Sequence, residues 1–249
     1  MSTIGIIPAR YASTRFPGKP LVRIGNKTMI QRVVERATTS QLFDHVLVAT
    51  DDERIAQHVE SLGFHVVMTS TEHQSGTDRC AEALEKSGLH ADAIVNIQGD
   101  EPLVHNAQLA QLVALIAQPD VDIATLVKPL EDETNLFNAN KVKVVINRLG
   151  RAMYFSRQTI PAQRGKSDAD WFSQGPYYQH IGLYAFKTSV LQHVVQLPVS
   201  YLEKSESLEQ LRWLEYGYNI AAGITHLETP AIDTPEDLEK LLKECDFPD

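Results

Sequence analysis

Short apolar runs alternate with longer segments of helical spacing through the first half of the chain. Between the runs, apolar residues recur every three to four positions, as amphipathic helices require. The predicted strands are Thr3–Pro8, Val46–Thr50, His65–Met68 and Ala93–Gln98, and the predicted helices are Lys27–Thr38, Asp52–Leu62, Thr77–Lys86 and Asn106–Ala117. This alternation is typical of βαβ units, so it predicts an α/β fold with a mainly parallel, Rossmann-like sheet flanked by helices.

The second half has a different pattern. Val142–Asn147 and Ala152–Ser156 predict a hairpin, and Gln179–Phe186 and Asn219–Ile224 predict two further strands. Helices are expected after Phe186 to about residue 196, over Ser207–Tyr216, and from Thr234, where Pro235 and Asp237 complete a helix-start pattern. No repeat or linker interrupts the sequence. We therefore predict one domain over residues 1–249 with an embedded β-rich lobe at about 128–200.

The charge of the chain is unevenly distributed. The protein has 249 residues with 23 Lys and Arg against 32 Asp and Glu, a net charge of −9. This balance argues against general nucleic-acid binding through a basic surface. Residues 1–34, however, contain six basic residues and no acid, which leaves 17 basic and 32 acidic residues for the remainder. The basic segment indicates a local anion site, and the alternative is a chance run on a solvated surface.

Two cysteines, Cys80 and Cys245, have no metal-binding spacing, and a reducing compartment fits them. Arg10 and Pro17 stand where a secretory signal would be apolar. The most apolar stretch, Leu109–Ala117, is too short to cross a bilayer. We therefore expect a cytoplasmic protein without membrane insertion.

The loop after the first strand is rich in groups that bind phosphate. It carries three cations, Arg10, Arg15 and Lys19, two hydroxyls and Gly18, whose small size permits close approach of a ligand. Neither GxGxxG nor GxxxxGK[ST] is present, which excludes the standard dinucleotide fingerprint and the P-loop. Because ligands of parallel sheets bind beyond the carboxyl ends of the strands, the loops after Pro8, Thr50 and Gln98 are expected to share one rim.

Eight motifs occur in order along nearly the whole chain. They are PARYASTRFPGKPL (8–21), ATDDERI (49–55), HQSGTDR (73–79), NIQGDEP (96–102), MYFSR (153–157), HIGLYAF (180–186), LEQLRWLEYG (208–217) and DTPEDLE (233–239). The sequence therefore resembles the 3-deoxy-manno-octulosonate (Kdo) cytidylyltransferases, within the sugar nucleotidyltransferases. The resemblance implies a nucleotidyltransferase sheet and the reaction of CTP with Kdo to give CMP-Kdo and diphosphate, for lipopolysaccharide biosynthesis.

Two aspartates are the expected metal ligands. Asp100 follows a strand and Asp233 precedes the last helix, and alone each is better explained as a turn or helix-start residue. The resemblance assigns Mg²⁺ to both, and Mg²⁺ is commonly held by one or two carboxylates plus substrate oxygens. It also assigns Lys19 to the diphosphate leaving group. The expected catalytic residues are thus Lys19, Asp100 and Asp233, without an obvious general base.

The remaining site residues follow from the resemblance. The expected nucleotide-binding residues are Ala9, Arg10, Ser13, Arg15, Lys19, Ser75, Gly76, Arg79, Gln98 and Gly99. The expected sugar-binding residues are Gln98, Arg157, His180, Tyr184, Glu209 and Gln210. Simpler alternatives exist for several of them. Arg79 and Glu209 would otherwise be solvated helix residues, Tyr184 a core residue, and His180 a structural hydrogen-bonding group.

One departure from the family pattern leaves the sugar preference open. Ala162 stands where many relatives have an aromatic residue after Ile-Pro, at the start of the 162–176 loop. Kdo, its 8-amino analogue or a sialic acid are therefore alternative substrates, and a non-catalytic nucleotide-sugar sensor is the rival from another class. The resemblance further implies a homodimer, through a lobe that serves sugar binding and dimerisation.

Overall fold

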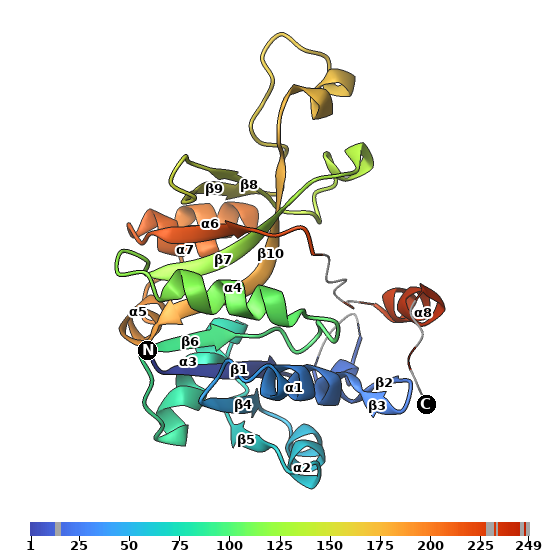
Figure 1. The fold of residues 1–249 in the computed structure, drawn as a ribbon, viewed down its shortest axis with the longest axis vertical. Coiled ribbons are helices and arrows are strands. Elements are labelled where there is room, and N and C mark those ends of the chain that lie inside the picture. The colour runs from blue at the N-terminus through green and yellow to red at the C-terminus, as the bar shows by residue number, and fades with distance from the viewer. Residues whose placement is uncertain (13–15, 228–231, 233, 245–246, 248–249) are drawn as a thin grey trace.

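The structure, a computed structural model, describes residues 1–12, 16–227, 232, 234–244 and 247. Its main sheet has the strand order β11-β7-β10-β6-β1-β4-β5, which Figure 1 shows as a twisted stack. These strands are β1 (Thr3–Ala9), β4 (His45–Thr50), β5 (His65–Met68), β6 (Ala93–Asn96), β7 (Ile123–Pro129), β10 (Tyr178–Lys187) and β11 (Ile220–Ile224). Along this path, β10 is antiparallel to both its neighbours, and the other adjacent pairs are parallel. The predicted α/β class is confirmed.

Helices cover both faces of the sheet, because alternate residues of each strand point to opposite sides. On β1, Ile4 and Ile6 pack into one core, whereas Ile7 and Ala9 pack into the other. The first core includes residues of α3 (Gly76–Ser87), α5 (Thr188–Val194) and α7 (Gln210–Glu215). The second includes residues of α1 (Met29–Thr39), α2 (Glu53–Ser61) and α4 (Asn106–Ile116).

The region predicted as a β-rich lobe is continuous with the main sheet. The predicted hairpin is confirmed as β8 (Lys143–Ile146) and β9 (Ala152–Ser156), and β8 pairs with Tyr178 and Gln179 of the long strand β10. The segment between β9 and β10 projects from the body at the top of Figure 1. This segment contains the short helices η3 (Asp168–Asp170) and η4 (Phe172–Gln174). A third short helix, η2 (Glu133–Asn135), lies elsewhere in the chain, after β7.

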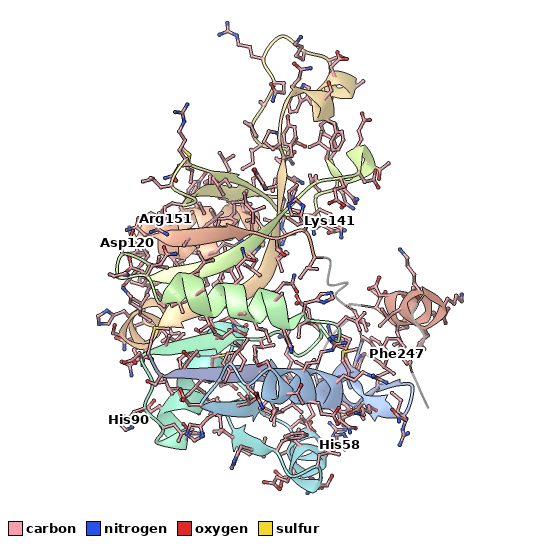
Figure 2. All side chains as sticks on the ribbon, in the orientation of Figure 1. His58, His90, Asp120, Lys141, Arg151 and Phe247 are labelled. Carbon is pink, nitrogen blue, oxygen red and sulfur yellow. The ribbon has the colours of Figure 1, made fainter. Side chains whose placement is uncertain are left out.

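The last helix forms a separate small core at the side of the sheet. Helix α8 (Pro235–Glu244) begins as predicted, since the Asp237 carboxylate and the Thr234 hydroxyl accept each other's backbone N–H. It packs near the hairpin of β2 (Arg23–Ile24) and β3 (Lys27–Thr28), where Ile24, Met29, Ile232 and Leu241 are buried together. Phe247 lies beside this hairpin, under the guanidinium of Arg32 (Figure 2).

Several elements differ from prediction. Strand β7 was not predicted at all, although its apolar run suits a strand buried on both faces. The helix expected from Lys27 starts at Met29, because Thr28 accepts a hydrogen bond from the Gln31 N–H as the N-cap. The helix expected over Ser207–Tyr216 is α7 alone, preceded by a separate helix α6 (Tyr201–Glu206). Ser207 has a left-handed φ of 52°, which ends α6.

Cys80 is buried and makes no disulfide, and Cys245 lies outside the described residues. In the described part of the chain, no helix is both long and apolar enough to cross a membrane.

Candidate active site

A cavity of about 230 Å³ opens beyond the carboxyl ends of β1 and β6, beside the start of α3. Nine of the predicted site residues line it, so the expected rim after Pro8 and Gln98 is confirmed. The third loop, after Thr50, reaches it through Asp51, which pairs with Arg79. The lining residues are Pro8, Ala9, Arg10, Lys19, Pro20, His73, Gln74, Ser75, Gly76, Arg79, Gln98, Gly99 and Asp100.

Two glycines explain how the backbone closes around this cavity. A Cβ atom at Gly99 would lie 2.7 Å from the Pro8 carbonyl oxygen, so any side chain there would push the two strand ends apart. Gly18 has φ +71° and donates its N–H to the Tyr11 carbonyl at 2.9 Å. This turn starts the short helix η1 (Lys19–Leu21), and Lys19 is thereby directed to the rim.

Lys19 and Asp100 form an ion pair at the edge of the cavity. The Lys19 ammonium lies 2.6 Å from Asp100 Oδ2, and the side chains are only 13% and 28% exposed. The ammonium also donates to the Ile232 carbonyl at 2.9 Å, and the Ile232 N–H donates to the Asp100 carbonyl at 3.2 Å. The residue that precedes Asp233 is thus held beside Asp100. Asp233 itself, like Ser13 and Arg15, lies outside the described residues.

Arg79 is buried in the wall of the cavity, with 3% of its surface exposed. Its guanidinium donates to Thr69 Oγ1 at 2.6 Å and to Asp51 Oδ2 at 2.7 Å. The alternative that Arg79 is a solvated helix residue is therefore wrong. Its contact with a cytosine base stays a prediction.

The start of α3 faces the same cavity. Ser75 is the N-cap, and its hydroxyl accepts from the Asp78 N–H at 3.1 Å. Gly76 follows it in the cavity lining. The first N–H groups of a helix carry partial positive charge, so this end of the 12-residue helix favours an anion.

The predicted sugar residues of β10 lie behind the rim, among aromatic rings. The His180 ring is 5.3 Å from that of Tyr184 and 5.0 Å from that of Phe155. Desolvation lowers the pKa of His180 to about 3, so the imidazole is neutral. Tyr184 also packs against Trp213, so its interpretation as a core residue is correct for the ring. Its buried hydroxyl has no hydrogen-bond partner among the described residues.

Glu209 connects the predicted nucleotide side of the site, at the start of α3, with the predicted sugar side, formed by β10 and α7. Its carboxylate accepts from the Thr77 hydroxyl at 2.8 Å and from the Ser75 hydroxyl, both at the start of α3. Burial raises the pKa of Glu209 in spite of these hydrogen bonds. The alternative that Glu209 is a solvated helix residue is therefore wrong, and the neighbouring Gln210 is buried as well. Thr77 was not predicted as a site residue, although it stands within the HQSGTDR motif, as do the cavity residues His73 and Gln74.

Gln98 is the second link between the two sides. It lines the cavity, and its side-chain amide donates to the Gly182 carbonyl of β10 at 2.9 Å. Its contacts with the nucleotide and with the sugar stay predictions.

Arg157 is not brought to the cavity. Its guanidinium donates to the carbonyls of Glu206 at 2.7 Å, Ser207 at 3.2 Å and Ala139 at 3.3 Å. In this arrangement Arg157 fixes the turn between α6 and α7, which leads to Glu209. Its contact with a sugar carboxylate stays a prediction.

A mainly parallel sheet with a cavity beyond its strand ends, beside the start of a helix, is typical of α/β proteins that bind nucleotides. Comparisons with known proteins narrow this class. The family model described as Cytidylyltransferase matches residues 4–220. A protein of Parabacteroides distasonis named 3-deoxy-manno-octulosonate cytidylyltransferase is 55% identical over 97% of both chains. One of the same name from Bacteroides thetaiotaomicron is 54% identical over 96% of both.

Solved structures agree with this result. A CMP:2-keto-3-deoxy-manno-octonic acid synthetase complexed with CTP superposes with a TM-score of 0.91, at 40% identity over 98% of both chains. A cytidylyltransferase of Leptospira borgpetersenii, with a TM-score of 0.63 and 19% identity over 97% of this chain and 85% of its own, shares the fold. The chain belongs to the 3-deoxy-manno-octulosonate cytidylyltransferase family, and it is a nucleotidyltransferase.

Proposed function

We propose that this protein catalyses the Mg²⁺-dependent reaction of CTP with Kdo to CMP-Kdo and diphosphate, in the cytoplasm, for lipopolysaccharide assembly. The names of the relatives support Kdo as the acid sugar, and the solved relative with bound CTP supports the nucleotide. The observation that carries the proposal is the Lys19–Asp100 pair, which lies at the mouth of a cavity between the first loop and α3.

The described residues fit a Mg²⁺ site completed by substrate. Asp100 offers a carboxylate that is partly exposed at the cavity, and Mg²⁺ accepts one or two protein carboxylates with phosphate and water oxygens as the other ligands. In the described ranges, no group of three or more acidic, His or Cys side chains that could hold a metal ion gathers. Asp100, with Asp233 as the expected second ligand, would hold the ion. Bound there, Mg²⁺ would supply positive charge that offsets the negative charge developing during phosphoryl transfer.

The protein's own groups then position the two substrates. Lys19 places an ammonium where negative charge grows on the leaving diphosphate. The start of α3 directs N–H groups at the nucleotide, and Glu209 connects this helix end to α7 on the sugar side. Catalysis in this scheme rests on positioning and electrostatics, as is usual for phosphoryl transfer.

A diphosphate-release assay with Mg²⁺ tests the proposal. Each of the four ribonucleoside triphosphates is combined with Kdo, 8-amino-Kdo and a sialic acid. We expect release with CTP and Kdo. Preference for another sugar would correct the substrate, and absence of release with every pair would favour the sensor alternative. Light scattering of the purified protein tests the proposed homodimer.

A further inference from the structure

Strand β10 contains an irregularity next to the site. It pairs with β7 up to Ile181 opposite Leu126, and pairing resumes at Tyr184 opposite Thr125. Gly182 and Leu183 are therefore extra residues on β10, and they form a bulge. On its other edge β10 pairs with β6, where Tyr184 is opposite Asn96. Bulges bend a strand and redirect its groups, and they are frequent beside active sites.

Thr125 fills this bulge from the neighbouring strand and is fully buried. Its hydroxyl oxygen lies 3.1 Å from the Ile181 carbonyl, 2.8 Å from the Leu183 carbonyl and 3.0 Å from Nε2 of His180. A hydroxyl has one hydrogen to donate, and carbonyls only accept. When that hydrogen is donated to the carbonyls of the bulge, the hydroxyl oxygen is left to accept from His180. Nε2 of His180 then carries the ring proton, and Nδ1 is an acceptor.

The same bulge holds Gln98. The Gly182 carbonyl points to the opposite side and accepts from the Gln98 side-chain amide at 2.9 Å. Consecutive carbonyls of the bulge thus bind Thr125 on one side and a cavity residue on the other. A change at Thr125 therefore reaches both His180 and Gln98.

We propose that Thr125 is a positioning residue, which sets the proton on Nε2 of His180 and, through the bulge, the position of Gln98. The inference rests on the proposed function, because it takes these two residues to contact the acid sugar. An acceptor at Nδ1 suits a donor such as a sugar hydroxyl. Thr125 itself touches neither substrate in this scheme.

Three variants test the kinetic part. Thr125→Val keeps the shape and removes the hydroxyl, Thr125→Ser keeps the hydroxyl, and Thr3→Val is a matched control. Thr3 is also a buried strand threonine, but its hydroxyl has no partner among the described residues. We expect Thr125→Val to raise the KM for the acid sugar about tenfold, the effect of one lost hydrogen bond, with a smaller change for CTP. Thr125→Ser and Thr3→Val are expected to resemble the unmodified enzyme.

Nitrogen-15 NMR of the imidazole groups tests the proton position in the unmodified protein without substrate. We expect a protonated Nε2 and an unprotonated Nδ1 for His180, assigned with His180→Gln. A protonated Nδ1 would overturn the inference, as would an unchanged KM for the sugar in folded Thr125→Val. The spectrum needs neither turnover nor a variant at Thr125. It therefore still tests the inferred proton position when Thr125→Val does not fold, or when the proposed reaction is not observed.

Discussion

The rim of the cavity and the buried cluster of His180, Tyr184 and Glu209 behind it use opposite kinds of polar groups. At the rim, charges are paired, as in the partly exposed pair of Lys19 with Asp100 and the largely buried pair of Arg79 with Asp51. Behind it, the titratable groups are pushed towards neutrality. Desolvation lowers the pKa of His180 to about 3 and raises the pKa of Glu209. The rim at the end of β6 and the buried residues of the neighbouring strand β10 are the two halves of the site, and they present different chemistry.

This difference matches the two substrates proposed above. A triphosphate is highly charged, and fixed cations and helix N–H groups bind it strongly. A sugar's hydroxyl groups are neutral, and a desolvated neutral acceptor or donor distinguishes them through the cost of leaving it unpaired. The link between the halves is formed by Glu209 with the start of α3, and by Gln98 with β10.

The largest effect is expected at the rim from Asp100→Ala. Loss of the carboxylate removes the expected metal ligand and leaves Lys19 without its partner Asp100, so kcat should fall about a thousandfold. Diphosphate release measures this, and circular dichroism verifies folding. Asp120→Ala, which removes an acid paired with Arg151 on the surface, is the control (Figure 2). Near-normal release by folded Asp100→Ala would refute the metal assignment.

Lys19→Ala should have the next largest effect. A charge-assisted hydrogen bond contributes about 1.5–3 kcal/mol, which corresponds to a fall in kcat/KM for CTP of about ten- to a hundredfold. Steady-state kinetics at saturating sugar measure it. The matched control is Lys86→Ala, a surface lysine paired with Glu82. If both variants use CTP equally well, Lys19 has no role in binding phosphate.

Substitution of Glu209 tests whether the nucleotide and sugar halves of the site bind their substrates independently. Because its carboxylate accepts from Thr77 and Ser75, Glu209→Ala should raise the KM values for both CTP and the sugar, by about tenfold. A double-mutant cycle of Glu209→Ala with Thr77→Val should give a coupling energy of about 0.5–3 kcal/mol. Additive effects of the two substitutions would show that the halves are not linked here.

The sequence predicted the rim better than the buried cluster behind it. Lys19, Gly99 and Asp100 follow strands in short motifs, so chain order alone places them at one edge of a parallel sheet. The buried cluster depends on contacts between distant segments, such as Thr77 with Glu209 and Thr125 with His180. No periodicity signals these contacts. Strand β7, which carries Thr125, was missed, and the bulge opposite it follows from the pairing of β10 with β7, not from local sequence.

The last prediction is a pH dependence of stability, and not of turnover, that comes from His180 in the buried cluster. The pKa of His180 falls from its ordinary 6.5 to about 3 in the folded protein, so below about pH 6.5 the unfolded chain binds a proton that the folded chain does not. The free energy of unfolding should therefore decrease as the pH falls from 6.5 towards 3, by at most about 1.4 kcal/mol per pH unit. Urea unfolding between pH 7 and pH 4 should show a shallower decrease for His180→Gln. The exposed His90, changed to Gln, should leave the slope unchanged. Equal slopes for all three proteins would mean that folding does not lower the pKa of His180, and the contrast between a charged rim and a neutral buried cluster would fail at that residue.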